Sequence, residues 1–277
     1  MWSVLRLVLS LALLDPTGAS ELSLRSVPEQ RVLTPGGDRL GYAPVAAPHT
    51  SDHRLSGVLL SRDPVTGGTV LCGGSVIRSK SRSLVLTAAH CLHDKGRTLK
   101  RVTFLPGYEE GRPPFGAWRA VRTWVPDRWR SEPYSPELLP YDVGLVGVAR
   151  GRRPLEDVTG RGLRTLRTRR GTSLGGLELL GYPAGRHYPG TELYHCVGDA
   201  VEAISREPGL LVTRNCHAPA GASGGPALYG DLVAGVVSSS SPLHDQSGFT
   251  VLARLGGGTF NQMLTRSDRW MRRHRPA

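Results

Sequence analysis

The chain has 277 residues, 39% of them apolar and 6% aromatic, and a formal net charge of +12. The length fits one large domain or two packed subdomains, and 35 glycines and 21 prolines among short Val- and Leu-rich runs favour β-structure over a helical bundle. The charge does not indicate a nucleic-acid-binding protein. It is mostly scattered arginine, and its two concentrations, at 161–170 and 269–275, are not interleaved with aromatic residues as a stacking platform requires. A solvated basic face is therefore preferred over a polyanion site.

The N-terminus has the features of a signal peptide. Arg6 precedes an apolar run over Leu7–Leu14, and small or turn-forming residues follow as far as Ala19. A run of this length is too short to cross a bilayer as a stable anchor, although a core helix or a retained anchor is the alternative. The sequence therefore predicts a signal peptide at 1–19, no stable membrane anchor, and a secreted, extracellular protein.

The rest of the chain divides by composition. Residues 20–50 are rich in proline, glycine and charge, which indicates a propeptide or linker. From about Leu55, short strands separated by turns are predicted. The first set is Leu55–Ser61, Thr69–Ile77, Ser83–Ala88, Arg101–Phe104 and Ala117–Val125. The second set is Leu177–Gly181, Leu193–Ile204, Leu210–Thr213, Pro226–Leu228, Leu232–Ser239 and Gly248–Ala253. The polar stretch 150–170 predicts a crossing between subdomains, and Asn261–His274 predicts a surface helix. Strands at this density favour a sandwich or barrel.

Three short motifs carry residues suited to acyl transfer. They are Leu86-Thr87-Ala88-Ala89-His90-Cys91, Tyr141-Asp142-Val143-Gly144-Leu145 and Gly221-Ala222-Ser223-Gly224-Gly225-Pro226. A serine hydroxyl needs a base within hydrogen-bond reach, histidine can be that base, and an aspartate behind it fixes its tautomer. Glycines beside the serine let amide N–H groups converge on an oxyanion. Each motif alone has a plainer explanation as a structural histidine, a turn or a loop, but the set in this order is specific.

The set resembles the trypsin/chymotrypsin clan of serine proteases, and in style the bacterial V8-like (glutamyl endopeptidase) branch. The resemblance covers about Leu55 to Ala253 and implies an all-β fold of two packed six-stranded antiparallel β-barrels with a short C-terminal helix. The protease domain would span 51–277, with one barrel at about 51–150, the other at about 171–260, and the site between them.

The resemblance also implies a role for each residue of the motifs. His90 would be the general base, Asp142 its orienting partner and Ser223 the nucleophile. The backbone N–H groups of Gly221 and Ser223 would form the oxyanion hole. No metal or organic cofactor is expected, and His93, three residues after His90, is interpreted as part of a surface turn rather than as a second metal ligand.

Four cysteines fit an exported protein that uses disulfides, and none shows the close C-x-x-C spacing usual in zinc sites. Spacing alone leaves three pairings open. The resemblance implies that Cys72 pairs with Cys91 and that Cys196 pairs with Cys216.

Departures from the family pattern concern activation and specificity. Ala222 stands where trypsin-like zymogens have an aspartate, so activation through a salt bridge to a new N-terminus is not expected. His217 stands where trypsin-like enzymes carry their pocket aspartate, so cleavage after Arg or Lys has no obvious electrostatic basis. A small or apolar residue before the scissile bond is favoured, and an acidic preference through His217 stays open. The histidine typical of glutamyl endopeptidases is replaced by Val237.

The predicted substrate pocket comprises His217, Ala218, Val237, Ser238 and Ser240. The resemblance gives Ser238 a second role, support of the Asp142 carboxylate. Ser239-Ser240-Ser241 stands where the family usually has Trp-Gly, which implies a more polar channel wall.

The sequence thus predicts a secreted serine endopeptidase that acts as a monomer on polypeptide substrates through an acyl-enzyme. Two alternatives stay open. One is a catalytically silent binding protein with the same barrels, and the other is an esterase that uses the same nucleophile.

Overall fold

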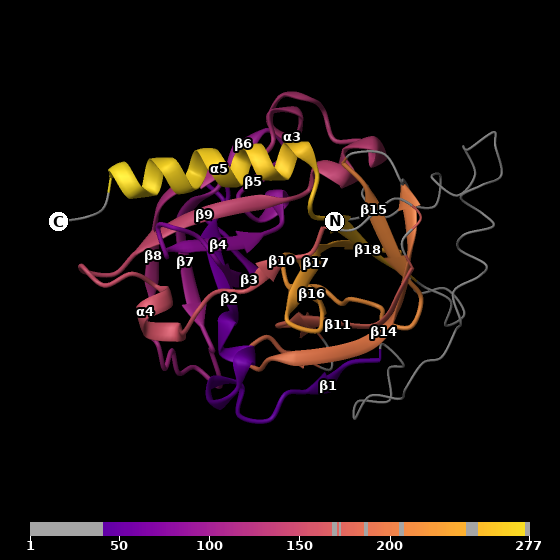
Figure 1. Ribbon diagram of the computed structural model, residues 1–277, viewed down its shortest axis with the longest axis horizontal. Helices are drawn as coiled ribbons and strands as arrows, with labels where there is room; N and C mark the ends of the chain where they lie inside the picture. The colour runs from indigo at the N-terminus through magenta and orange to yellow at the C-terminus, as the bar shows by residue number, and fades with distance from the viewer. Residues whose placement is uncertain are drawn as a thin grey trace.

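The computed structural model describes residues 41–167, 171, 173–185, 188–204, 208–241 and 249–274. The predicted signal peptide at 1–19 lies outside these residues, as does most of the predicted propeptide or linker. Strands make up most of the regular secondary structure in the described chain and form two barrels, which stand side by side in Figure 1, the first in purple and magenta and the second in orange.

The first barrel closes from six strands, each antiparallel to its neighbours. Around the barrel these are β2 (Ser56–Arg62), β3 (Thr69–Ile77), β4 (Leu84–Thr87), β9 (Gly144–Ala149), β8 (Trp118–Trp124) and β7 (Lys100–Pro106). Five of them correspond to strands predicted from the sequence, with ends shifted by a few residues. The strand β9 was not predicted, because it is buried along nearly its whole length and shows no alternation of polar and apolar residues.

The second barrel also closes from six antiparallel strands. In order they are β14 (Tyr194–Ile204), β11 (Ser173–Gly181), β16 (Pro226–Tyr229), β17 (Leu232–Ser240), β18 (Thr250–Arg254) and β15 (Leu210–Thr213). Two short strands extend this sheet: β1 (Ala43–Pro44) pairs with β14, and β10 (Arg164–Thr165) runs parallel to β17. The prediction of two six-stranded antiparallel barrels is confirmed.

The remaining elements lie before, between and after the barrel strands. The hairpins are β5 (His93–Asp94) with β6 (Arg97–Thr98), and β12 (Ala184–Gly185) with β13 (Tyr188–Pro189). The 3-10 helices are η1 (Pro48–Thr50), η2 (Asp52–Leu55), η3 (Ala89–Cys91) and η4 (Pro136–Tyr141), and the α-helices are α3 (Asp127–Ser131), α4 (Glu156–Thr159) and α5 (Gly258–Arg273). Among the described residues, no helix is long and apolar enough to cross a membrane.

The C-terminal helix expected at Asn261–His274 is present as α5, and it joins the two barrels. It follows the second barrel in the chain and lies over the first in Figure 1. Its Met271 packs against Gly147 of β9, where any larger residue would collide with the methionine sulfur. The helix therefore fastens the end of the chain to the barrel formed by its first half.

The segment before the first barrel is built into the second. Besides the pairing of β1 with β14, the Val45 N–H donates to the Leu193 carbonyl at 2.8 Å. The Tyr42 side chain is fully buried in the second core. Residues 41–50, at the end of the segment predicted as propeptide or linker, thus contribute to the packed fold.

The barrels share a core where they meet. Leu86, Phe104 and Trp118 of the first barrel belong to the same buried apolar cluster as Leu180 and Val236 of the second. Such continuous burial holds the barrels as one body, so residues on facing edges keep a fixed relation to one another.

Candidate active site

His90 is placed by the end of a buried strand. All four residues of β4 are buried, and the single 3-10 turn η3 follows directly and carries His90. The next residue, Cys91, is bonded to Cys72 on β3, with 6.2 Å between the two Cα atoms. The turn is therefore held to the barrel on both sides, and the His90 side chain stays 26% exposed.

Asp142 binds His90 twice. Its Oδ1 accepts the His90 backbone N–H at 2.9 Å, and its Oδ2 lies 2.7 Å from His90 Nδ1. The Ser238 hydroxyl donates to the same Oδ2 at 2.6 Å, and Asp142 is only 1% exposed. A carboxylate can only accept, so Nδ1 carries a proton and Nε2 is left free to act as a base. The support of Asp142 by Ser238 that the resemblance implied is present.

The surroundings of His90 raise its pKa above the ordinary histidine value. Burial is the largest single influence, and it favours the neutral ring. The charge of Asp142 and its hydrogen bond to the ring favour the imidazolium, and Asp94 adds to them. Together these outweigh burial, so the site stabilises the positive charge that the ring acquires when it takes a proton.

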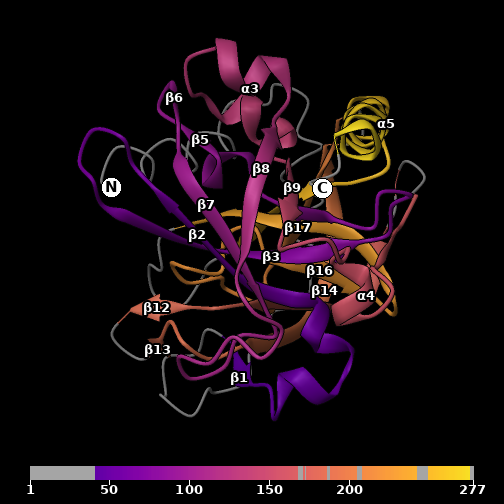
Figure 2. The same ribbon diagram turned by 90° about the vertical axis from the view of Figure 1, so that its left-hand side faces the viewer.

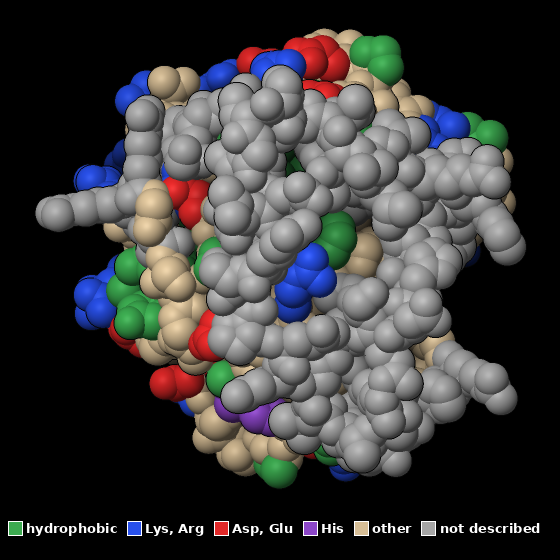
Figure 3. All heavy atoms as spheres, turned by 90° about the vertical axis from the view of Figure 1, so that its right-hand side faces the viewer, with side chains coloured by type: hydrophobic (Ala, Val, Ile, Leu, Met, Phe, Trp, Pro, Cys, Tyr) green, Lys and Arg blue, Asp and Glu red, His purple; other side chains and the backbone are tan. Residues whose placement is uncertain are grey.

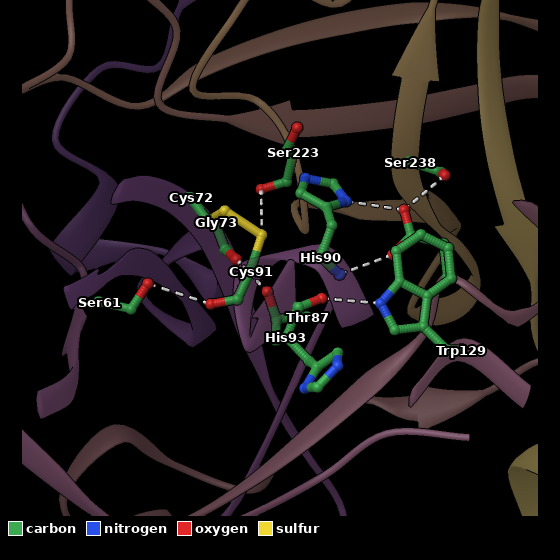
Figure 4. The surroundings of a disulfide bond; sticks show 11 residues. Ser61, Cys72, Gly73, Thr87, His90, Cys91, His93, Trp129, Ser223 and Ser238 are labelled. Atoms are coloured by element: carbon green, nitrogen blue, oxygen red, sulfur yellow. Dashed lines mark hydrogen bonds and ion pairs between the residues drawn. A yellow bond between two sulfur atoms is a disulfide. The ribbon is translucent and has the colours of Figure 1, made fainter. Parts of the chain in front are cut away.

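Ser223 lies in a loop that is bonded to both barrels. The Gly73 N–H of β3 donates to the Ser223 carbonyl at 2.7 Å, across the boundary between barrels. Within the second barrel, Gly224 N–H donates to the Val237 carbonyl at 2.8 Å and Val237 N–H donates to the Gly225 carbonyl at 2.9 Å. Figure 4 shows Ser223 beside His90. The Ser223 carbonyl oxygen lies 3.9 Å from the sulfur of Cys91.

Glycines are required where this loop meets its neighbours. Gly224 has φ +78°, and a Cβ there would collide with the Thr87 hydroxyl. A Cβ on Gly225 would collide with the Leu180 carbonyl oxygen. The two glycines that follow Ser223 are thus fixed by steric contact with both barrels.

The backbone on the other side of Ser223 leaves two N–H groups available. The Ala220 carbonyl accepts a hydrogen bond from Ala184 N–H at 2.6 Å, so it does not turn toward Ser223. The next residue, Gly221, has φ +89°. Within the described part of the chain, the N–H groups of Gly221 and Ser223 donate to no protein acceptor. Unpaired amides in such a loop can receive an oxyanion.

The structure places the Ser223 hydroxyl next to His90 without a hydrogen bond between them among the described residues. In unliganded enzymes this contact is commonly long and shortens when a substrate binds. The structure thus joins His90, Asp142 and Ser238 in one network and brings Ser223 alongside it.

The predicted pocket residues lie around the base of the loop that carries Ser223. His217 is buried, and its Nε2–H donates to the Ser241 carbonyl at 2.7 Å. The neighbouring Ala218 N–H donates to the hydroxyl of Thr250 at 2.8 Å, which donates in turn to the Cys216 carbonyl at 2.8 Å. Sequence reasoning missed Thr250. Its only signal was a polar residue inside the last predicted strand.

The remaining pocket residues belong to β17. Val237 is buried, Ser238 is turned to Asp142, and Ser240 is half-buried at the end of the strand. Residues 242–248, which follow in the chain, lie outside the described residues. Ala222 is fully buried, and its N–H donates to the Pro219 carbonyl at 3.1 Å.

Both disulfides have the partners that the resemblance implied, Cys72 with Cys91 and Cys196 with Cys216. The sulfurs of the first lie within 4.8 Å of a His90 nitrogen, the only such grouping among the described residues. Since these sulfurs are bonded to each other, they are not thiolates and do not form a metal site with His90.

The interpretation of His93 as part of a surface turn was wrong. The residue lies in β5 with 6% of its surface exposed, and Trp129 Nε1 donates to its carbonyl at 2.8 Å. Its Nδ1 is 3.1 Å from the Thr98 hydroxyl. The contact with Trp129, a residue far along the chain, could not be inferred from the spacing of His90 and His93.

No protein-family model matches the chain, and no curated protein matches it. Solved structures do match. The protease Anisep from Arthrobacter nicotinovorans is 24% identical with a TM-score of 0.66, over 78% of this chain and 96% of that one. The thermostable serine protease AL20 from an extremophilic microorganism is 20% identical with a TM-score of 0.67, over 78% and 97%. A Glu endopeptidase is 16% identical with a TM-score of 0.60, over 83% and 97%.

These similarities concern the arrangement of the chain, and they agree with the strand pairing described above. Two closed six-stranded antiparallel barrels, one C-terminal helix and a site where the barrels meet are what the sequence resemblance implied. The protein therefore has the chymotrypsin-like fold that these serine proteases share.

Proposed function

We propose that the protein is a serine endopeptidase in which Ser223 is the nucleophile, His90 the general base and Asp142 its orienting partner. The observation that carries the proposal is the Asp142 carboxylate, which binds both His90 and Ser238 and leaves His90 Nε2 free beside Ser223. The unpaired N–H groups of Gly221 and Ser223 supply the second requirement, an oxyanion hole.

The reaction follows from these positions. Ser223 Oγ attacks the carbonyl carbon of the scissile peptide bond while His90 Nε2 takes its proton, and the carbonyl oxygen becomes an oxyanion bound by the Gly221 and Ser223 N–H groups. His90 then gives the proton to the leaving amine as the C–N bond breaks, which leaves an acyl-enzyme. Water loses a proton to His90 and attacks this ester, and Ser223 recovers its proton as the acid product leaves.

Two further features of the proposal concern location and substrate. The two disulfides fit an extracellular location, and with the predicted signal peptide at 1–19 they support secretion. The proposed enzyme acts as a monomer on polypeptides. The specificity we propose is for a small or apolar residue before the scissile bond. No carboxylate is present at position 217 to attract Arg or Lys, and the His217 Nε2–H already donates to Ser241.

Covalent labelling of the mature protein with a fluorophosphonate tests the nucleophile. The expected result is one adduct on Ser223, found by peptide mapping and absent in the Ser223→Ala and His90→Ala variants. Peptide hydrolysis by these variants should fall by a factor of about 10⁶. A folded wild-type chain that gives no adduct, before and after its N-terminal segment is trimmed, would instead be a silent binding protein. An adduct with ester turnover but no peptide cleavage would make it an esterase.

Cleavage-site sequencing on a peptide library tests the specificity separately. The expected products end in small or apolar residues. Products that end in Asp or Glu would assign His217 to an acidic preference, and products that end mostly in Arg or Lys would show that position 217 does not line the pocket.

A further inference from the structure

The first barrel has one seam that is barely closed. The strands β7 and β8 are seven residues long each, yet they pair only at Thr103 with Arg119 and at Phe104 with Trp118. Beyond these pairs the strands diverge and leave a groove of about 630 Å³ between residues 99–103 and 119–123. Both strands face the viewer in Figure 2.

The groove is lined by cations and by no acidic residue. Lys100, Arg101, Arg119 and Arg122 are all exposed, and within the described ranges none of them forms an ion pair. Elsewhere many arginines do have partners, as Arg97 has Asp63. The cations of the groove are thus free to bind an anion from outside the chain.

One of these cations, Arg122, is held in place by aromatic rings. The Arg122 guanidinium lies 5.8 Å from the ring centre of Trp124 and 5.0 Å from that of Trp270. Such stacking fixes the charge at the mouth of the groove without neutralising it.

Arg101 occupies a backbone conformation that suits glycine. Its φ is +51°, in the left-handed region. It lies at a bulge, since Leu60 pairs with Thr103 while Arg62 pairs with Lys100, so β7 has one residue more than β2 there. Bulges redirect side chains, and strained residues often mark functional sites. Glycine would adopt this conformation without strain, so the backbone here does not require an arginine.

The groove also exposes backbone. The outer edge of β7 pairs with β2 and that of β8 with β9, whereas the edges that face the groove, at residues 100–102 and 120–123, have no strand partner in the described chain. An unpaired edge accepts an extended peptide through main-chain hydrogen bonds.

We propose that this groove, the β7–β8 groove, binds an acidic polypeptide segment in an extended conformation. Such a segment supplies carboxylates for the four cations and N–H and C=O groups for the two free edges, whereas a sulfated glycan supplies only charge. The groove is distinct from the candidate active site but close to it in the chain, since the Leu99 N–H at its end donates to the carbonyl of Leu92, two residues after His90. On the opposite face, the described Lys and Arg side chains in view are scattered (Figure 3).

The test measures binding to the full chain carrying Ser223→Ala, so that no probe is cleaved. The probe is a fluorescein-labelled peptide of about ten alternating Glu and Val residues, enough to run along strands of this length, read by fluorescence anisotropy. We expect this peptide to bind, and we expect its binding to weaken as salt is added. The same peptide with Gln in place of Glu should not bind. Arg101→Gly combined with Arg119→Gln should weaken it about tenfold.

Matched variants separate this site from net charge and from folding. Arg152→Gln with Arg161→Gln removes the same charge from exposed positions outside the groove and should leave binding unchanged. Arg101→Gly relieves the strained φ, so its melting temperature should equal or exceed that of the parent, and any loss of binding is then not a loss of fold.

Two further probes test whether the ligand of the groove is a peptide. The same acidic peptide with alternate residues N-methylated keeps its charge but loses main-chain donors, and it should bind more weakly. Equal binding of the methylated peptide, or of a sulfated oligosaccharide with the same dependence on Arg101 and Arg119, would overturn the peptide assignment. If the control with Arg152→Gln and Arg161→Gln lost as much affinity as the Arg101→Gly, Arg119→Gln variant, the assignment of the binding site to the groove would be wrong.

Discussion

In the first barrel, His90 and Asp142 are held by side-chain contacts, whereas in the second barrel the loop around Ser223 is held by its own backbone. Asp142 is buried and binds the ring and the backbone of His90. Around Ser223, by contrast, the Ser223 carbonyl accepts a hydrogen bond from the backbone N–H of Gly73, and Gly224 and Gly225 exchange backbone hydrogen bonds with Val237.

The difference indicates what each half of the site can tolerate. A side-chain network loses a defined charge or hydrogen bond when one member is replaced, and the backbone around it stays in position. A loop held by close backbone approach depends on glycines and is displaced when a Cβ is added. Substitutions in the first barrel should therefore change chemistry, and substitutions along the contact between barrels should change position.

Among variants that keep Ser223 and His90, the largest expected effect comes from Asp142→Asn. The amide keeps the shape of the carboxylate but favours the wrong His90 tautomer, so kcat for peptide hydrolysis should fall about 10⁴-fold, as in the Ser-His-Asp template. Near-ultraviolet circular dichroism should be unchanged, because only a proton position is altered. A kcat within tenfold of wild type would show that Asp142 does not orient the base.

A smaller loss is expected from Gly73→Ala, which replaces none of His90, Asp142 and Ser223. Its Cβ would lie 3.0 Å from the Cα and N atoms of Gly225, so the nucleophile loop must shift by a few tenths of an ångström. Misplacement on this scale lowers the fluorophosphonate labelling rate of Ser223 by up to about 10²-fold.

The neighbouring glycine of β3 supplies the control. A Cβ on Gly74 meets Val85 and Leu86 within the first barrel instead of the loop of the second. Gly74→Ala should therefore lower the melting temperature while leaving the labelling rate per folded molecule near that of wild type. Equal labelling rates in the two variants would remove the distinction between the halves of the site.

The same distinction explains what the sequence could predict. His90, Asp142 and Ser223 stand in short motifs whose residue types report their chemistry, so their candidate roles could be assigned without coordinates. The strand β9 and the buried position of His93 could not be predicted. Continuous burial gives no alternation to detect, and His93 is bonded through its carbonyl to Trp129, which lies 36 residues away in the sequence.

Contacts that depend on backbone approach were also beyond the sequence. Glycines at 224 and 225 indicated a tight loop, but not that Gly73 in another barrel would bond to the carbonyl of Ser223. The splayed seam between β7 and β8 was likewise invisible, since both strands were predicted correctly and only their pairing reveals the groove. Residue types indicate the chemistry of a site, but the register of strand pairing has to be taken from the structure.

Ser238→Ala should have a milder effect than Asp142→Asn, about tenfold on kcat. The variant removes one of the hydrogen bonds that Asp142 receives, but the carboxylate keeps its charge and both contacts to His90. KM should change little if Ser238 acts only through Asp142. A rise in KM without a fall in kcat would instead place Ser238 among the residues that contact substrate.

The smallest expected effect concerns how activity and stability depend on pH. Protonation of His90 should lower the activity but raise the stability of the fold. Only neutral His90 accepts the Ser223 proton, so kcat/KM should be full above the His90 pKa in the folded protein and fall below it. That pKa is raised, mainly because Asp142 outweighs burial, so the protonated ring stabilises the fold. This contribution is complete below the pKa of an unfolded histidine and is lost as pH rises through the folded value.

The melting temperature of wild type minus that of His90→Gln should therefore grow as pH falls, over the range in which hydrolysis is being lost. In Asp142→Asn the charge that favours the imidazolium is gone and burial remains. The acid limb of its residual activity should then move to lower pH, and the stability difference should shrink or reverse in sign. An acid limb at the same pH in both proteins would mean that Asp142 does not set the pKa of His90. The chemistry of the first barrel would then depend on burial, and the contrast with the second barrel would lie in geometry alone.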